Sequence, residues 1–287
     1  MKFKQLSLAA LCAAFMLTLS FVACKKDSAS KEDNTSDIEI AENNVLAEGT
    51  YNDMTIMTDQ AINTGVVALR VDGTNGTNGT EGTLGSPCAT VTIDTVANPH
   101  TITVDFGSAN CMCADGRNRR GKIIASYTGR YRDSNTVITF TVNNYFVNDN
   151  QVKGTKTITN KGHNASGYLV YKVEVNGQIV KANNGGTVNW VSTQERAWTV
   201  GEKTLTPLDD VYSITGTASG TTAAGGAYTI AITKPLVRQL VCRWFESGVI
   251  SLTPEGKSAR TLDYGSSGCD ANATVTIAGI SFPVVLP

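Results

Sequence analysis

The feature that most constrains the fold is a series of short segments after residue 88 in which apolar and polar residues alternate. Ala89–Asp94 and Thr101–Phe106 alternate cleanly, with a turn at Asn98, Pro99 and His100. A period of two residues is typical of half-buried strands. Further segments continue the series: Lys122–Arg130, Thr136–Asn144, Val152–Asn160, Tyr168–Asn176, Thr187–Trp198, Val211–Ala218, Ala227–Thr233, Gly248–Thr253, Ser258–Tyr264 and Ala273–Phe282.

Gly, Asn, Asp or Pro fills most gaps between these segments, which favours antiparallel hairpins. No repeated strand–helix–strand pattern follows residue 85, which argues against an α/β enzyme fold. We therefore predict a mainly β protein: residues 86–287 form a large antiparallel sandwich or a curved β-meander, preceded by a short helical segment.

Residues 38–85 are predicted to hold that helical segment, a short strand and a loop. Ser36–Asn63 shows helical spacing of apolar residues, and Gly49 is expected to break or end its first part. A strand is expected at Gly65–Val71. The following run, rich in Gly, Asn and Thr, is interpreted as a surface loop, and calcium binding by its Asp, Asn and Glu oxygens is the less favoured alternative.

The N-terminus has the pattern of an export signal. Lys2 and Lys4 precede the apolar run Leu6–Val22, and small Ala23 precedes Cys24. We interpret residues 1–23 as a lipoprotein signal peptide, Cys24 as the lipidation site for palmitate-type chains, and residues 24–37 as a disordered tether. Ordinary secretion and an uncleaved membrane helix are the alternatives.

Export permits disulfides. Thr103–Cys111 and Thr261–Cys269 share a short sequence motif in which Asp precedes Cys by six positions. This internal similarity suggests that one β unit was duplicated to give two halves, and coincidence is the alternative. It predicts the disulfides Cys88–Cys111 and Cys242–Cys269. Cys113 is left over, and Cys88–Cys113 is the competing pairing.

The sequence predicts no catalytic residues, no metal site and no cofactor. His100 and His163 lack the context of a catalytic triad. The carboxylates considered for glycan hydrolysis stand in no recognisable motif: Asp105, Glu195, Asp209, Asp210, Glu246 and Asp263. A net charge of −1 and a pI of about 6.1 give no electrostatic basis for nucleic-acid binding.

Two residue groups are the candidates for ligand binding. Exposed aromatic rings stack on sugars, and the candidates are Trp190, Trp198 and Trp244. Trp190 and Trp198 share one face of a strand, which fits a core stripe and a binding platform equally well. The basic run Arg117, Arg119 and Arg120 could bind anionic headgroups, although such runs are usually solvated loops.

The stretches Gly121–Asp133, Val152–Asn160 and Leu262–Gly265 resemble a family of uncharacterised Bacteroidetes envelope lipoproteins, and the likeness runs from about Thr101 to the end. Lys25, Lys26 and Asp27 also resemble the export tag of surface lipoproteins in those bacteria. The resemblance implies an envelope location and a β-rich body, with Cys113 additional to the pattern.

Together these observations predict a non-enzymatic lipoprotein, anchored by its N-terminal lipid in the outer membrane, with surface display favoured over a periplasmic orientation. Its expected partner is a glycan or an envelope protein. The alternatives are a carboxylate-dependent hydrolase acting on envelope or extracellular glycans and a purely structural envelope component.

Overall fold

A computed structural model describes residues 34–63, 89–113, 115–204, 206–242, 244–266 and 268–286. The chain divides into two compact units, Met1–Asn34 and Thr35–Pro287, and the second contains every described strand and the helix from Thr35 onward. Several predictions lie outside the described residues: the signal peptide, Cys24, residues 24–33 of the tether, the strand Gly65–Val71, the loop after it and Cys88. Residues 34–37, predicted as the end of the disordered tether, are helical instead.

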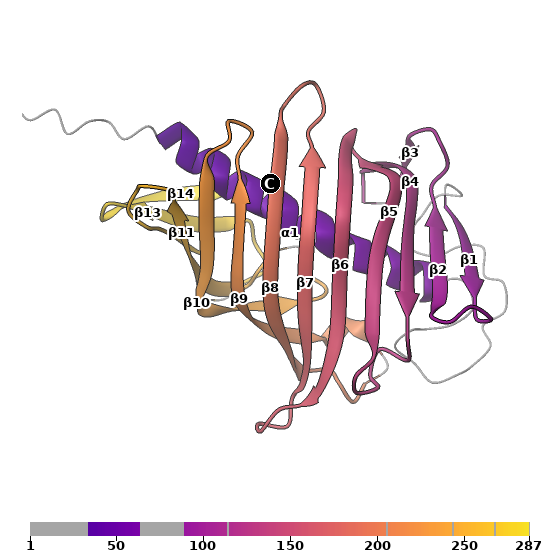
Figure 1. Cartoon of the computed structure of the whole chain (residues 1–287). Coiled ribbons are helices and arrows are strands. Elements are labelled where there is room, and N and C mark those ends of the chain that lie inside the picture. The colour runs from indigo at the N-terminus through magenta and orange to yellow at the C-terminus, as the bar shows by residue number, and fades with distance from the viewer. Residues whose placement is uncertain are drawn as a thin grey trace, which may run out of the picture. The chain divides into compact units, whose positions relative to one another are not determined.

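The second unit is mainly β, as predicted, and takes the meander form with a single open antiparallel sheet (Figure 1). Each strand on the main path pairs with the next one along the chain, while β3 pairs only with β4. The strands are β1 (Thr90–Asp94), β2 (His100–Asp105), β3 (Cys111–Met112), β4 (Asn118–Tyr127), β5 (Val137–Val147), β6 (Asn150–His163), β7 (Leu169–Val180), β8 (Thr187–Val200), β9 (Val211–Thr221), β10 (Ala227–Gln239), β11 (Ser247–Pro254), β12 (Arg260–Asp263), β13 (Asn272–Ile277) and β14 (Ile280–Val285).

Two details of the strand prediction need correction. The segment Ala273–Phe282 is a hairpin, because Ala278 and Gly279 both adopt positive φ angles and turn the chain back. The short strand β3 has no alternating pattern long enough to recognise in the sequence. It exists because Cys111 and Met112 pair with Arg119 and Asn118 of β4.

The helix α1 (Asn34–Asn63) runs unbroken through Gly49, contrary to the prediction that this glycine ends its first part. Gly49 is exposed, and no heavy atom outside the helix lies within 4 Å of the position of a Cβ atom there. A glycine inside a helix costs only about 1 kcal/mol. Burial of the flanking turns outweighs that cost, since Ala47, Tyr51 and Met54 are fully buried.

α1 crosses one face of the sheet, meeting the strands in reverse order (Figure 1). Near its start Glu39 accepts a hydrogen bond from Ala223 between β9 and β10, and further on Asn44 accepts one from Trp190 of β8. Tyr51 then reaches β6 and β7, and Asp53 reaches β4. The helix therefore ties together strands from most of the sheet's width.

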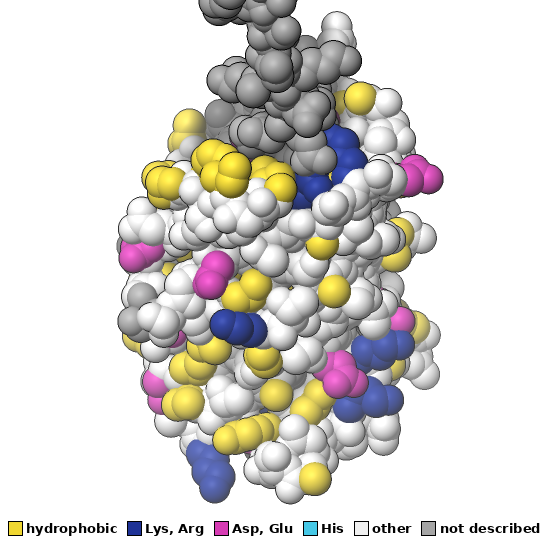
Figure 2. All heavy atoms as spheres, turned by 90° about the vertical axis from the view of Figure 1, so that its left-hand side faces the viewer, with side chains coloured by type: hydrophobic (Ala, Val, Ile, Leu, Met, Phe, Trp, Pro, Cys, Tyr) yellow, Lys and Arg dark blue, Asp and Glu magenta, His cyan; other side chains and the backbone are white. Residues whose placement is uncertain are grey.

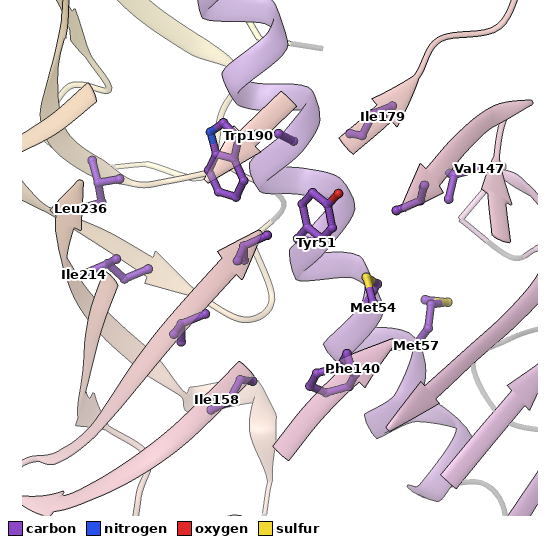
Figure 3. Close-up of a cluster of buried hydrophobic side chains, with 14 of the residues drawn as sticks. Tyr51, Met54, Met57, Phe140, Val147, Ile158, Ile179, Trp190, Ile214 and Leu236 are labelled. Atoms are coloured by element: carbon purple, nitrogen blue, oxygen red, sulfur yellow. The ribbon is translucent and has the colours of Figure 1, made fainter. Parts of the chain in front are cut away.

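The core lies between α1 and the inward face of the strands. Figure 3 shows Tyr51 and Met54 of the helix pointing among side chains from both sides, with Trp190 and Phe140 close by. On β7 inward residues such as Tyr171, Val173 and Val175 are buried while their neighbours are partly exposed. This alternation is what made the strands visible in the sequence.

One glycine allows the closest approach of helix and sheet. The hydroxyl of Tyr51 donates to the backbone oxygen of Lys153 over 2.7 Å, and its ring stacks against Trp190 at 6.0 Å between centroids. A Cβ atom on Gly177 would lie 2.0 Å from the Tyr51 hydroxyl oxygen. The Tyr51 ring can therefore occupy this position beside β7 only because residue 177 has no side chain.

The two copies of the motif, Thr103–Cys111 and Thr261–Cys269, share a local structure. Asp105 accepts a hydrogen bond from the amide of Gly107, and Asp263 accepts one from Gly265. The amide of Phe106 then donates to the backbone oxygen of Gly121 in β4, whereas the amide of Tyr264 donates to the backbone oxygen of Gly248 in β11. The two turns thus contain the same Asp–Gly hydrogen bond, but the first turn bonds to a later strand and the second to an earlier one.

The structure tests part of the disulfide pairing that was predicted from the repeated motif. The Cys242–Cys269 disulfide is confirmed, with the Cα atoms 5.4 Å apart. Cys111 is also disulfide-bonded, and its predicted partner Cys88 lies outside the described residues. Cys113 is a buried free thiol.

The sheet is open, and its last strand β14 forms one edge. Figure 2 views this side of the molecule, where apolar side chains are scattered among polar ones. Ile280, Phe282 and Val285 are exposed, and Pro283 interrupts the edge of β14. Proline cannot donate a ladder hydrogen bond, which discourages another chain from pairing there. Among the described residues, no helix combines the length and apolar character needed to cross a bilayer.

Candidate functional site

A pocket of about 700 Å³ lies along α1 and is here called the helix groove. Its floor is formed by helix residues that include Glu48 and Asp53. One wall is the β3–β4 turn with the β5–β6 turn, and the other is the connection from β10 to β11. Distant parts of the chain thus meet because the sheet curves around the helix.

The β3–β4 wall is held in place by the tight β5–β6 turn. Asn148 and Asp149 adopt positive φ angles at that turn. The side chain of Asn148 accepts a hydrogen bond from the backbone of Asn118, and Asp149 forms an ion pair with Arg120. These contacts fix the loop that carries Asp115 and Arg117 beside the groove.

A buried ion cluster lies at this end of the groove. The guanidinium of Arg119 is completely buried and contacts Asp53 at 2.8 Å and Asp115 at 2.6 Å. Arg117 lies 3.7 Å from the second Asp53 oxygen. Arg119 and Asp53 are its buried members, whereas Arg117 and Asp115 are partly exposed. Removal of Arg119 would leave the buried Asp53 with only the longer contact to Arg117.

The same cluster shifts the protonation of its members. Burial raises the pKa of Asp53 above its usual value, against the opposing charge of Arg119. Burial alone would also raise the pKa of Asp115, but hydrogen bonds from Arg119 lower it. Burial and the charge of Asp53 raise the pKa of the nearby Tyr145 hydroxyl. Burial and the arginines thus act in opposite directions on Asp53, and burial prevails.

The middle of the groove holds a second satisfied carboxylate. Glu48 accepts a hydrogen bond from the Gln194 amide over 2.8 Å and pairs with Arg196 at 3.2 Å. Arg196 also donates to Asn52 over 2.8 Å. Gln194 and Arg196 lie on the inward face of β8, so the polar stripe of the helix is matched by polar residues of the sheet.

The far end of the groove is mostly apolar and carries one arginine. Arg238 lies near the end of β10, opposite Tyr212 of β9, and its guanidinium carbon stands 5.7 Å from the centre of the Phe245 ring. Phe245 packs in turn against Tyr264. Burial, with the charge of Arg196, lowers the pKa of Arg238 to about 10, partly offset by Glu48.

The structure separates the predicted aromatic candidates. Trp190 and Trp198 are buried in the core, which leaves no exposed ring there for a sugar. Their even spacing therefore reflects a core stripe. Trp244 is partly exposed and lines the helix groove.

The three arginines of the basic run also lie in different environments. Arg117 lines the groove, whereas Arg119 is buried behind it and serves the ion cluster. Arg120 points elsewhere, pairs with Asp149 and stacks on the ring of Phe146. Of the three, only Arg117 is placed to touch a molecule in the groove.

The carboxylates considered from the sequence do not line the groove. Asp105 instead pairs with Lys122 beside its turn, and His163 pairs with Glu202 away from the groove. Within the described ranges, no three His, Cys, Asp or Glu side chains gather closely enough to hold a metal ion.

Comparisons with protein-family models, with curated proteins and with solved structures found no match to this chain.

The sequence did not identify the residues that shape the groove. Glu48 and Asp53 lie in a helical segment whose polar residues suggest a solvated face, and Arg238 ends a strand. Asn, Thr and Asp are frequent between Asn43 and Asp53, and this polar run is the part of the helix that lines the groove.

Proposed function

We propose that this protein is a lipoprotein of the bacterial cell envelope that binds a small ligand in the helix groove and does not transform it. The anchor is the lipid on Cys24, and surface display on the outer membrane is favoured. The export signal, the Ala23–Cys24 junction and the polar stretch after it support the location. The binding role is supported by the groove itself, since ligand sites typically enclose about 300–1,000 Å³.

The groove offers the mixed lining of a binding site. Apolar side chains such as Leu46, Leu240 and Phe245 lie beside the charged groups of Glu48 and Arg238. Apolar surface supplies affinity and a few polar groups fix orientation. The proposed partner of this groove is accordingly a small molecule or a sugar unit at the end of a glycan.

The anchor is tested by Cys24→Ser. We expect the variant to leave the membrane fraction and to lose labelling by radioactive palmitate, because the cysteine proposed to carry the lipid is gone. Cys12→Ala, a cysteine change inside the export signal, is the matched control and should keep both properties. A Cys24→Ser protein that stays labelled and membrane-bound would overturn the proposed anchor.

The groove is tested with the full chain carrying Cys24→Ser, so that no acyl chain competes. Nile red, a neutral dye that fluoresces in apolar sites, is the probe. Val45 is a partly exposed helix residue that lines the groove, whereas Glu42 is exposed on the same helix outside it. Val45→Trp should reduce binding at least tenfold and Glu42→Trp should not. Equal binding by both variants would refute the groove as the site.

A glycan hydrolase is the second candidate, because Glu48 and Asp53 both line the groove. Their five-residue spacing corresponds to a rise of about 7.5 Å between backbone positions along the helix axis. Glycosidase carboxyl groups act in pairs about 5–10 Å apart. The raised pKa of Asp53 also suits a general acid. Each group is, however, already paired with an arginine. Hydrolysis of nitrophenyl glycosides that disappears in Asp53→Asn would establish this candidate in place of passive binding.

A further inference from the structure

Arg238 is the one cation of the helix groove that has no carboxylate partner among the described residues. Its guanidinium faces the ring of Phe245 and feels the longer-range charges of Arg196 and Glu48. Arg238 is partly exposed, and an arginine partly removed from water without a carboxylate in direct contact carries a desolvation cost. Its position on the groove lining means that a bound molecule could reach it.

The other charges of the groove are already compensated. Glu48 is satisfied by Arg196 and Gln194, and Asp53 by Arg119. The charged groups in and directly behind the groove are three carboxylates and four arginines: Glu48, Asp53, Asp115, Arg117, Arg119, Arg196 and Arg238. The surplus is one positive charge, and Arg238 is the member left without an ion pair.

The surroundings of Arg238 are apolar. Leu240, Phe245, Tyr264 and Leu286 line the same part of the groove, and Phe245 packs on Tyr264 with the ring centres 5.2 Å apart. A molecule that places a negative group at Arg238 would therefore lay the rest of its body on apolar side chains. A fully polar anion would leave that surface without a partner.

We propose that the helix groove binds a small anionic amphiphile, whose carboxylate or phosphate group pairs with Arg238 and whose apolar body packs against Phe245 and Tyr264. This inference rests on the proposed binding function and names the class of ligand. Guanidinium suits both headgroups because it donates two parallel hydrogen bonds to either one.

The test is displacement of Nile red from the Cys24→Ser chain by decanoate, decyl phosphate and decanol, which share one apolar chain. We expect either anion to displace the dye at least tenfold better than decanol, since a charge-assisted hydrogen bond contributes about 1.5–3 kcal/mol and each 1.4 kcal/mol is tenfold. Preference for decanoate would indicate a carboxylic acid, and preference for decyl phosphate a phosphate ester. Equal displacement by decanol would overturn the inference.

Variants of Arg238 test the assigned partner. Arg238→Met should reduce the advantage of the anions over decanol about tenfold, both measured in the same variant, whereas Arg238→Lys should retain most of that advantage. Lys161→Met removes the same charge from an exposed site nine residues along β6 from Val152, about 30 Å away at the rise of a strand, and should change nothing. Undiminished anion binding by Arg238→Met would refute the pairing.

The two proposals fail in different ways. If Nile red does not bind the parent chain, or Val45→Trp does not block it, the groove is not a binding site. If Nile red binds and is blocked but anions have no advantage over decanol, only the ligand class is wrong. The comparison of decanoate with decanol uses the parent chain, so it decides the inference even if an Arg238 variant fails to fold.

Discussion

At the scale of single residues, two arginines at the groove, one buried and one partly exposed, are used in different ways. Arg119 satisfies two carboxylates and joins the helix to the β3–β4 wall. Arg238 is placed at the other end of the groove without such a partner among the described residues. The sequence showed both as ordinary arginines, because burial and pairing depend on contacts between residues far apart in the chain.

The first prediction concerns Arg119. Arg119→Met should lower the free energy of unfolding by about 3–5 kcal/mol, because the buried Asp53 loses its hydrogen-bonded partner and keeps only the 3.7 Å contact to Arg117. Urea denaturation followed by circular dichroism measures this loss. Adding Asp53→Asn to the variant should recover part of it, since one unpaired charge is then removed.

The neighbouring Arg120 is the matched control. Its ion pair with Asp149 is partly exposed, and such pairs contribute about 0–1 kcal/mol. Arg120→Met should therefore have little effect. Equal losses for Arg119→Met and Arg120→Met would show that the buried cluster has no special weight in stability.

At the scale of elements, the strands were predictable and the hairpin boundaries less so. Alternation identifies a strand whenever one face is buried, and segments such as Thr187–Trp198 correspond to β8 almost residue for residue. Ala278–Gly279 was missed because its turn depends on backbone angles that alanine seldom adopts. The predicted break at Gly49 was wrong because packing of the turns on both sides keeps the helix intact over one residue of low helix propensity.

The second prediction concerns the contact of α1 with β7. Gly177→Ala should lower the free energy of unfolding by about 2–3 kcal/mol, because the added methyl group overlaps the Tyr51 ring. In a Tyr51→Leu background the same change should cost under about 1 kcal/mol, since the overlap is gone. Thermal unfolding of the four proteins measures the coupling. Equal costs in both backgrounds would contradict this account of the glycine.

At the scale of the whole molecule, the groove is a product of curvature. A flat meander would keep the β3–β4 turn and the β10–β11 connection apart, yet both line one pocket. Alternation predicts strands and their order but carries little information on how strongly a sheet curves. The site could therefore not be assembled from the sequence, although Arg117 and Trp244 on its opposite walls were both among the candidates.

The third prediction concerns the Cys242–Cys269 disulfide, which fixes the β10–β11 wall. Its half-cystines lie 27 residues apart, and a loop of this size is stabilised by about 3–4 kcal/mol in the chain-entropy model. Replacing both by Ser should reduce stability by about that amount and weaken Nile red binding, because Val241 and Trp244 flank Cys242. Cys113→Ala, which breaks no disulfide, should cost clearly less. Unchanged stability and binding in the double variant would show that the wall needs no crosslink.

The path of α1 across the sheet has a consequence for the order of folding. Neighbouring strands are adjacent in the chain, so hairpins can form by local encounters. The helix, in contrast, finds Arg119 66 residues later and Trp190 146 residues later. Contacts of such long sequence separation form slowly. The helix, which precedes the described strands in the chain, is therefore expected to dock last, and until β8 is in place the face that it buries must stay uncovered or be shielded by a chaperone.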